Sequence, residues 1–251
     1  MVRVMAADDV TVHGHTHRLD LVDPSVRDFT ATVVAVDPER GIVLDRSAFY
    51  PGGGGQPPDE GVLLWGGVRT RIVGTFRGDD LYLVPAEGDP VPAAGTEVRG
   101  AIDDERRTGL MRTHSGLHIL TAVVFRDFGA KVTGGNMEPL TARMDFDLPE
   151  VPEGFKDRVA EAVNVEIALD RPISARLLPR AEAFEIPNLV RTTADLLPEH
   201  LQTIRVVDID GLDQQADGGT HVASTKLIGR VDVVKVENKG RGFRRLRVRV
   251  S

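Results

Sequence analysis

Apolar residues follow two different periods along the chain, and the change between them lies near residue 102. Over residues 18–101, short runs rich in β-branched residues alternate with Gly and Pro, as in 29–36, which is followed by the turn signal Asp37-Pro38. Further runs of this kind cover 41–45, 62–65, 68–73 and 80–84. Several short strands with close turn signals predict a small barrel or sandwich.

Beyond residue 102 the apolar positions recur at helical spacing. Leu110, Leu117 and Leu120 lie on one stripe of a helix predicted over 106–128, and a second amphipathic helix is predicted over 155–169. Strands are predicted at 142–146, 173–177, 203–208, 227–236 and 243–250, with a hairpin turn at 238–242. Helices beside an antiparallel sheet predict an α+β domain over 102–251.

The segment 1–17 is predicted to be a flexible N-terminal tail. His13, His15 and His17 alternate within it and could form a stray metal-binding cluster. A solvated end is the better interpretation, because terminal segments without apolar anchors tend to be disordered.

The composition is that of an ordinary globular protein, with 41% apolar and 27% charged residues among 251. No apolar run approaches the roughly 20 residues that cross a bilayer, and acidic residues interrupt the N-terminus where a signal peptide needs an apolar core. The chain has no cysteine, which excludes disulfides and a thiolate metal site. These observations fit a cytoplasmic location.

The net charge of −7 argues weakly against nucleic-acid binding, because phosphate neutralisation needs Lys and Arg. The distribution of charge changes this picture. The segment 226–249 is rich in Lys and Arg, and its only acidic residues are Asp232 and Glu237. Two interpretations stay open: a solvated hairpin with charges on its outer face, or a basic edge that follows an RNA backbone.

Two distant motifs carry the candidate chemistry, His114-Ser-Gly-Leu-His118 and Asp217-Gly-Gly-Thr-His221. On a helix, side chains four residues apart project from one face about one turn apart. The glycines in the second motif place it on a tight loop. Three imidazoles and a carboxylate could close on one divalent ion, for which zinc fits best.

Each motif alone has a plainer interpretation, either two histidines on one helix face or an ordinary turn. The metalloprotease motif HExxH is excluded, because no glutamate stands between His114 and His118 to act as a base. Whether Asp217 binds the ion directly stays open. Four protein ligands leave no free position, whereas His114, His118 and His221 alone would leave one for water or substrate.

At these residues the chain resembles the free-standing alanyl-tRNA editing proteins, AlaX, in their medium form, and the editing domain of alanyl-tRNA synthetase. The resemblance runs from about Leu19 to Val250. It rests on Phe49-Tyr-Pro with the glycine-rich segment to Gln56, on Arg106-Arg107 with the HxxxH motif, and on the motif 217–221. The family usually has a cysteine where this chain has Asp217.

The resemblance implies a β-barrel-like N-terminal domain over 18–101, followed by an α+β editing domain over 102–251, as in the editing domain that threonyl- and alanyl-tRNA synthetases share. It implies a zinc-dependent hydrolase that releases serine, with glycine as a second candidate, from mischarged tRNA(Ala). The partner would be the acceptor end of that tRNA, rather than DNA or a membrane. The ion could lower the pKa of a water molecule, or it could bind the amino group of the amino acid and orient the ester.

The resemblance also assigns expected roles to individual residues. The metal ligands would be His114, His118 and His221, while ligation by Asp217 and the identity of the ion stay open. The other expected site residues are Gln215 and Thr220 as catalytic polar contacts, Gly53, Gly54, Gly55 and Gln56 at the aminoacyl end, and Arg106 and Arg107 on phosphate. The alternatives are loop hydrogen bonds, a flexible lid and salt bridges along the helix, respectively.

Two other functions remain as alternatives. The missing cysteine could mark a tRNA-binding homologue with impaired catalysis. The acidic net charge could instead fit a metal-dependent hydrolase of a small ester or amide.

Overall fold

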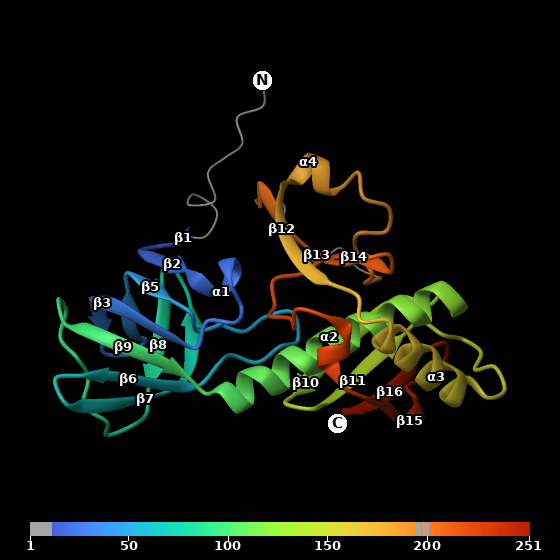
Figure 1. The fold of residues 1–251 in the computed structure, drawn as a ribbon, viewed down its shortest axis with the longest axis horizontal. Coiled ribbons are helices and arrows are strands. Elements are labelled where there is room, and N and C mark those ends of the chain that lie inside the picture. The colour runs from blue at the N-terminus through green and yellow to red at the C-terminus, as the bar shows by residue number, and fades with distance from the viewer. Residues whose placement is uncertain (1–11, 194–196, 198–200) are drawn as a thin grey trace. The chain divides into compact units, whose positions relative to one another are not determined.

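The computed structural model describes residues 12–193, 197 and 201–251 and divides the chain into two compact units (Figure 1). The first unit holds the chain up to Gly53 and Pro57–Arg107, and the second holds Gly54–Gln56 and Thr108–Ser251. The division falls inside the first turn of helix α2 (Asp104–Phe128), a few residues after the predicted boundary. Among the described residues, no helix combines the length and the apolar character needed to cross a membrane.

The first unit is built on a closed antiparallel barrel with the strand order β3-β4-β8-β7-β6-β9, which confirms the predicted small barrel. Its strands are β3 (Asp28–Asp37), β4 (Gly41–Leu44), β6 (Gly61–Trp65), β7 (Val68–Arg77), β8 (Leu81–Pro85) and β9 (Glu97–Ile102). The sequence did not predict β9, which closes the barrel by pairing with both β3 and β6.

Alternate side chains of the barrel strands fill its interior, as the strand period of two requires. In β3, Phe29, Ala31 and Val33 are buried, and the residues between them are not. The ring of Phe29 packs edge-on against Phe49 with the centroids 5.9 Å apart. The β-branched and aromatic residues that predicted the strands are therefore the ones that form the core.

Residues 12–17, which were predicted as part of a flexible tail, form paired strands instead. Strand β1 (Val12–His13) pairs with β2 (Thr16–Arg18), and β2 pairs with β5 (Arg46–Ser47) before the short helix α1 (Leu19–Val22). Residues 1–11 of the predicted tail lie outside the described residues.

Polar contacts hold this N-terminal hairpin, which is why an apolar pattern did not reveal it. The hydroxyl of Thr16 donates to the Leu44 carbonyl at 2.7 Å. The Nδ1 atom of His15 lies 2.8 Å from Oδ2 of Asp80, and Nε2 of His13 lies 2.9 Å from the Gly78 carbonyl oxygen.

The second unit packs two helices on a four-stranded antiparallel sheet of order β10-β11-β16-β15. The strands are β10 (Val132–Glu138), β11 (Thr141–Phe146), β15 (Val231–Asn238) and β16 (Arg244–Val250), and the helices are α2 and α3 (Phe155–Ala168). Leu246 and Val248 of the sheet share one buried core with Leu117 of α2 and Val163 of α3. The helices thus cover one face of the sheet, and the expected α+β arrangement is confirmed (Figure 1).

The opposite face of this sheet carries the basic residues of the C-terminal hairpin, because Leu246 and Val248 point inward and their neighbours point outward. Arg245 donates to both carboxylate oxygens of Asp145, at 2.6 and 2.7 Å. Arg247 donates to Glu237 at 3.1 Å. These pairs favour the solvated-hairpin interpretation, and the RNA-binding edge stays a prediction.

A three-stranded antiparallel sheet of order β12-β13-β14 completes the second unit. Its strands are β12 (Ile173–Pro179), β13 (Thr203–Ile209) and β14 (Asp213–Ala216), with the helix α4 (Arg180–Ala183) after β12. The prediction of one strand over 227–236 was wrong at its start, because Thr225–Ile228 form the 3-10 helix η2 and β15 begins at Val231.

Candidate metal centre

Helix α2 presents His114 and His118 on one face, one turn apart, as their spacing predicts. Both imidazoles are buried, with 4% and 7% of their surface exposed. Ser115 lies beside them in the interior, and its hydroxyl oxygen accepts from the backbone N–H of Val222 at 3.2 Å. The helix therefore supplies two preoriented nitrogen donors away from solvent.

The loop 217–221 follows β14 and is held by internal hydrogen bonds. The Asp217 carboxylate accepts from the Gly219 backbone N–H through Oδ2 at 2.6 Å. From β13, Nη1 of Arg205 donates to the carbonyl oxygens of Asp217 and Gly219, at 3.1 and 2.9 Å. These contacts place His221, which is 5% exposed, against the helix.

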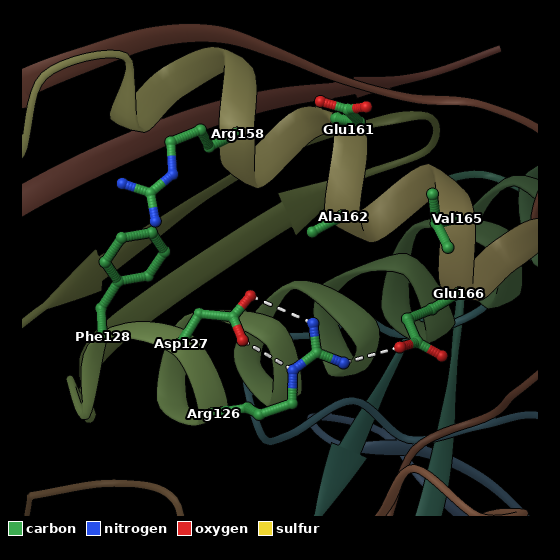
Figure 2. A pocket seen from close by; sticks show the side chains of 8 residues that line it. All are labelled: Arg126, Asp127, Phe128, Arg158, Glu161, Ala162, Val165 and Glu166. Carbon is green, nitrogen blue, oxygen red and sulfur yellow. Dashed lines mark hydrogen bonds and ion pairs between the residues drawn. The ribbon is translucent and has the colours of Figure 1, made fainter.

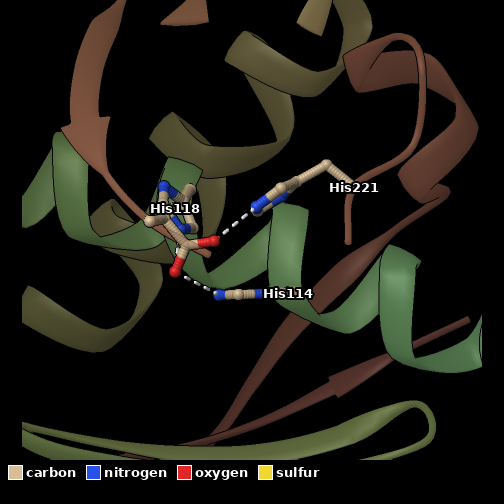
Figure 3. A group of neighbouring side chains, drawn as sticks. His114, His118 and His221 are labelled. Carbon is tan, nitrogen blue, oxygen red and sulfur yellow. Dashed lines mark hydrogen bonds and ion pairs between the residues drawn. The ribbon is translucent and has the colours of Figure 1, made fainter. Parts of the chain in front are cut away.

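The Nε2 atoms of the three imidazoles converge on the Asp217 carboxylate. Figure 3 shows the three labelled imidazoles grouped together. The distance to the nearer oxygen is 3.0 Å for His221, 3.4 Å for His114 and 3.9 Å for His118. All four donor atoms lie within 4.8 Å of one another. Zinc binds His nitrogen and carboxylate oxygen at about 2.0–2.2 Å, so one ion among these four groups needs only small side-chain movements.

The electrostatics of the cluster suit a cation. Burial lowers the pKa of His118 well below its usual range and lowers the pKa of His221 to about 4. Burial alone would raise the pKa of the Asp217 carboxyl, but the adjacent His114 and His221 outweigh it and hold this pKa well below its usual range. At His118 and His221 the site therefore offers neutral imidazoles, and at Asp217 a carboxylate anion, which are the forms that bind a metal.

Gln56 lies in this cluster although the sequence predicted it as a substrate contact. Its Oε1 lies 2.9 Å from Nδ1 of His114 and accepts from the Thr220 backbone N–H at 3.1 Å. Its Nε2 donates to the Thr220 hydroxyl at 2.9 Å. Gln56 is buried, and so is Thr220, which the sequence predicted as a catalytic polar contact.

The other predicted residues of the glycine-rich segment divide between the two units. Gly53 belongs to the first unit, where its carbonyl accepts from the Tyr50 hydroxyl at 3.0 Å. Gly54 and Gly55 belong to the second unit with Gln56. The three glycines have φ of 129°, 58° and 89°, a backbone path that L-residues rarely follow, which explains the glycine run.

Gln215 is not among the residues that meet the imidazoles. It lies on β14, and its Nε2 donates to Oδ2 of Asp213 at 2.7 Å. This contact fits the alternative of a loop hydrogen bond, and the catalytic role of Gln215 stays a prediction.

Arg107 differs from the prediction that it holds phosphate, whereas the phosphate role of Arg106 stays a prediction. Arg107 is fully buried and forms an ion pair with Asp59, and its guanidinium also donates to the carbonyls of Pro24 and Ala48, at 2.8 and 2.6 Å. A guanidinium enclosed in this way has a structural role. Arg106 donates to the Pro58 carbonyl at 3.1 Å and lies 3.3 Å from Glu60.

Two residues of the site, Arg205 and Ser115, were not predicted from the sequence. Arg205 had no local signal, because its contacts with the loop 217–221 depend on strand pairing. Ser115 stands inside the HxxxH motif, and its hydroxyl oxygen lies 3.2 Å from Nδ1 of His221. Its position as a polar residue between the two helix histidines is the only feature of the sequence that could have indicated its role in the site.

A depression between α2 and α3 is lined by side chains of both helices (Figure 2). Arg126 crosses it and donates to Asp127 at 2.7 Å and to Glu166 at 2.6 Å. The guanidinium of Arg158 lies 5.3 Å from the centroid of the Phe128 ring. Because Arg126 is engaged by carboxylates on both sides, this depression offers less chemistry than the imidazole cluster.

Comparisons with known proteins show that the sequence is similar to one group of tRNA-related proteins. The family described as "Threonyl and Alanyl tRNA synthetase second additional domain" matches residues 204–247, which include the loop of the cluster. The alanyl-tRNA editing protein AlaX-M of Saccharolobus solfataricus is 37% identical over 238 residues, which are 92% of this chain and 97% of that protein. AlaX-M of Methanosarcina acetivorans is 36% identical over 242 residues, with the same coverage of 92% and 97%.

The similarity also reaches longer enzymes. The alanine–tRNA ligase of Pyrobaculum neutrophilum is 36% identical over 229 residues, which are 88% of this chain but only 25% of that enzyme. The chain therefore matches one part of the ligase and nearly the whole of AlaX-M. With the barrel and the α+β unit in the predicted order, the chain belongs to the family of alanyl-tRNA editing proteins of the AlaX-M type.

Proposed function

We propose that this chain is a metal-dependent aminoacyl-tRNA deacylase that hydrolyses Ser-tRNA(Ala) and, as a second substrate, Gly-tRNA(Ala). The observation that carries the proposal is the convergence of three imidazole Nε2 atoms on the Asp217 carboxylate in a chain of the AlaX-M family. The reaction adds water to the ester carbonyl. It releases the free amino acid and the hydroxyl of the terminal ribose of the tRNA.

The substrate class follows from the limits of recognition by binding. A pocket that accepts alanine cannot strongly reject glycine or serine, because one small group changes binding by about 1–3 kcal/mol. A second, hydrolytic site corrects the resulting errors. The relatives carry the name of alanyl-tRNA editing proteins, so we propose the acceptor end of tRNA(Ala) as the partner.

The donor set suits zinc, and it is also compatible with harder divalent ions. Imidazole suits zinc, iron and cobalt, while the carboxylate of Asp217 favours harder ions than a thiolate would. A bound divalent ion would supply Lewis-acid chemistry at the ester. Among the protein groups, His114, His118 and His221 would hold the ion, with Asp217 as the fourth donor.

Thr220 is the protein group that we propose to act on the substrate. Its hydroxyl oxygen already accepts a hydrogen bond from Gln56, so the hydroxyl hydrogen points away from that amide and can be donated elsewhere. A donor directed at the ester carbonyl stabilises the charge that develops there during hydrolysis.

Gly54 is an exposed residue beside this centre. A Cβ atom on Gly54 would lie 3.6 Å from Oδ1 of Asp217. We propose that the aminoacyl end of the tRNA enters next to this glycine, where backbone N–H groups can approach it without a side chain between.

The test is a deacylation assay on Ser-, Gly- and Ala-charged tRNA(Ala), with and without a chelator, together with metal analysis. Chelation should abolish serine release and added zinc should restore it. His114→Ala should lose both metal and activity, while the exposed histidine variant His15→Ala keeps both. Normal metal content and deacylation in His114→Ala would contradict the proposal.

The same assay separates the competing functions. Tight tRNA binding without turnover in the metal-loaded protein would favour an impaired homologue, for which the residue Asp217 is the specific reason. Turnover of small esters with no salt-dependent tRNA binding would favour a small-molecule hydrolase, because phosphate contacts release counterions and weaken with salt.

A further inference from the structure

We propose that Gln56 is a positioning residue of the metal centre, which keeps the Nδ1 atom of His114 protonated so that its Nε2 lone pair is directed at the ion. This inference rests on the proposed metal site. It assigns Gln56 a different role from that of a substrate contact, and it makes the segment Gly54–Gln56 part of the wall of the centre.

The first step fixes the orientation of the Gln56 amide. Its oxygen and nitrogen cannot be told apart by shape, so the assignment must come from partners of known character. The backbone N–H of Thr220 can only donate, and it lies 3.1 Å from the atom assigned as Oε1. That atom is therefore the oxygen, and the nitrogen is the atom 2.9 Å from the Thr220 hydroxyl oxygen.

The second step fixes the proton on His114. Its Nδ1 lies 2.9 Å from the same amide oxygen, which can only accept. Nδ1 must then carry the hydrogen, and this leaves Nε2 as the atom with the free lone pair. Metal-binding histidines commonly donate their second ring N–H to a carbonyl or carboxylate in this way.

The third step concerns what lies between His114 and Asp217. The Nε2 atom of His114 is 3.4 Å from Oδ1 of Asp217. With Nδ1 protonated, a neutral ring presents a lone pair to a carboxylate oxygen, and two acceptors repel each other. A positive charge between them, either a metal ion or a second proton, removes the repulsion. The contact between Gln56 and His114 therefore favours the binding of a cation at this site.

Burial prevents water from replacing this contact. Gln56 is 2% exposed and His114 is 4% exposed. The Oε1 atom of Gln56 already accepts two hydrogen bonds, which uses both of its lone pairs. Both lone pairs of Oε1 are therefore occupied by groups of the protein, and this oxygen is not available to a substrate.

The backbone of the segment is anchored in the same unit. The Gly55 carbonyl accepts from the Met137 backbone N–H at 3.3 Å. Gly54–Gln56 make their contacts with the second unit, although the residues on both sides of them belong to the first. A segment fixed at its backbone and at its terminal amide is a support for His114 rather than a mobile lid.

The experiment measures zinc affinity by competition with a chelator in the full-length protein, for the wild type, Gln56→Met, Gln56→Glu and Gln215→Met. Gln56→Met should bind zinc about 10–100-fold more weakly, the usual effect of removing such a partner. Gln56→Glu should stay within a few-fold of wild type or bind more tightly, because a carboxylate still accepts from His114. Gln215→Met is the matched control, since it makes the same change at a buried glutamine that bonds to Asp213.

Equal zinc affinity in the wild type and Gln56→Met would overturn the inference, and so would an equal loss in Gln56→Met and Gln56→Glu. A second measurement does not depend on any variant folding. The 15N spectrum of the imidazoles in the wild-type protein should show His114 protonated at Nδ1 with and without zinc. A His114 ring without a proton on Nδ1 would also overturn the inference, whereas a wild type that binds no metal would instead contradict the proposed function.

Discussion

Gly219 lies against the ring of His114 so closely that a Cβ atom in its place would be 2.3 Å from Cε1 and 2.4 Å from Nδ1 of that ring. The same Cβ atom would be 2.7 Å from Oε1 of Gln56. The loop therefore needs a glycine at this position for lack of space. The neighbouring Gly218 has no atom within 4 Å of such a Cβ.

These two glycines make a matched pair of variants. Gly219→Ala should push His114 away from Gln56 and lower zinc affinity and deacylation at least tenfold, because both contacts of the ring are disturbed. Gly218→Ala should leave zinc affinity within a few-fold of wild type. Chelator competition and the Ser-tRNA(Ala) assay measure both effects, and equal behaviour of the two variants would show that the loop adapts.

The second prediction concerns the buried pair of Arg107 and Asp59. Arg107→Met leaves the Asp59 carboxylate buried without its charged partner, and breaking such a pair costs about 3–5 kcal/mol. Arg106→Met should cost about 0–1 kcal/mol, because its ion pair with Glu60 is partly exposed. Denaturant unfolding measures both free energies.

This comparison also tests the phosphate-binding interpretation of the two arginines. If Arg107→Met unfolds like the wild type but binds tRNA more weakly, Arg107 contacts the substrate after all. If stability falls and tRNA affinity measured below the unfolding transition does not, the structural role stands.

The spacing of apolar residues and the runs of β-branched residues predicted the elements that depend on a local pattern. The helical stripe over 106–128 gave α2, and runs of β-branched residues gave five of the six barrel strands. Strands β9 and β14 were missed because pairing with distant strands, rather than composition, defines them. Strand β10 was missed for a local reason, since Gly134 and Gly135 interrupt its pattern.

The candidate site divides in the same way. Both candidate metal-binding motifs are contiguous in sequence, so each could be predicted from its own spacing. The contact between Gln56 and His114 joins residues 58 positions apart, and no pattern near either residue indicates it. Arg107 was predicted as a phosphate contact because nothing in its neighbourhood in the sequence indicates the buried ion pair with Asp59.

The third prediction is a pH dependence at the pair of Asp145 and Arg245 on the outer face of the sheet. Hydrogen bonds from Arg245 hold the pKa of the Asp145 carboxyl below its usual value of 3.8. A lowered pKa stabilises the folded state above the unfolded-state pKa, and this contribution disappears as the pH falls through the folded-state value. Arg245→Met should therefore be less stable than the wild type at pH 7, and the difference should shrink below about pH 4.

Urea unfolding between pH 3 and pH 7 measures this difference. Arg241→Met is the control, because Arg241 lies in the turn of the same hairpin, is exposed and makes no ion pair with a described residue. A wild-type and Arg245→Met difference that stays constant down to pH 3 would show that Arg245 stabilises the sheet through packing rather than charge.

The fourth prediction addresses Asp217, at the position where the resemblance implies a cysteine. A thiolate is softer than a carboxylate, so Asp217→Cys should raise the preference for zinc over manganese at least tenfold. Asp217→Asn keeps the shape but removes the charge, and it should weaken binding of every divalent ion. Competition between zinc and manganese, measured by metal analysis after dialysis, gives the preference directly.

The control for this series is Asp208→Asn, in which the changed carboxylate accepts from Gln214 at 2.7 Å and lies outside the imidazole cluster. It should bind both metals as the wild type does. An unchanged metal preference in Asp217→Cys would mean that Asp217 does not touch the ion and that the three histidines hold it alone. Such a centre would leave one coordination position for water or for the amino group of the substrate, so the result also decides how the ester can approach the ion.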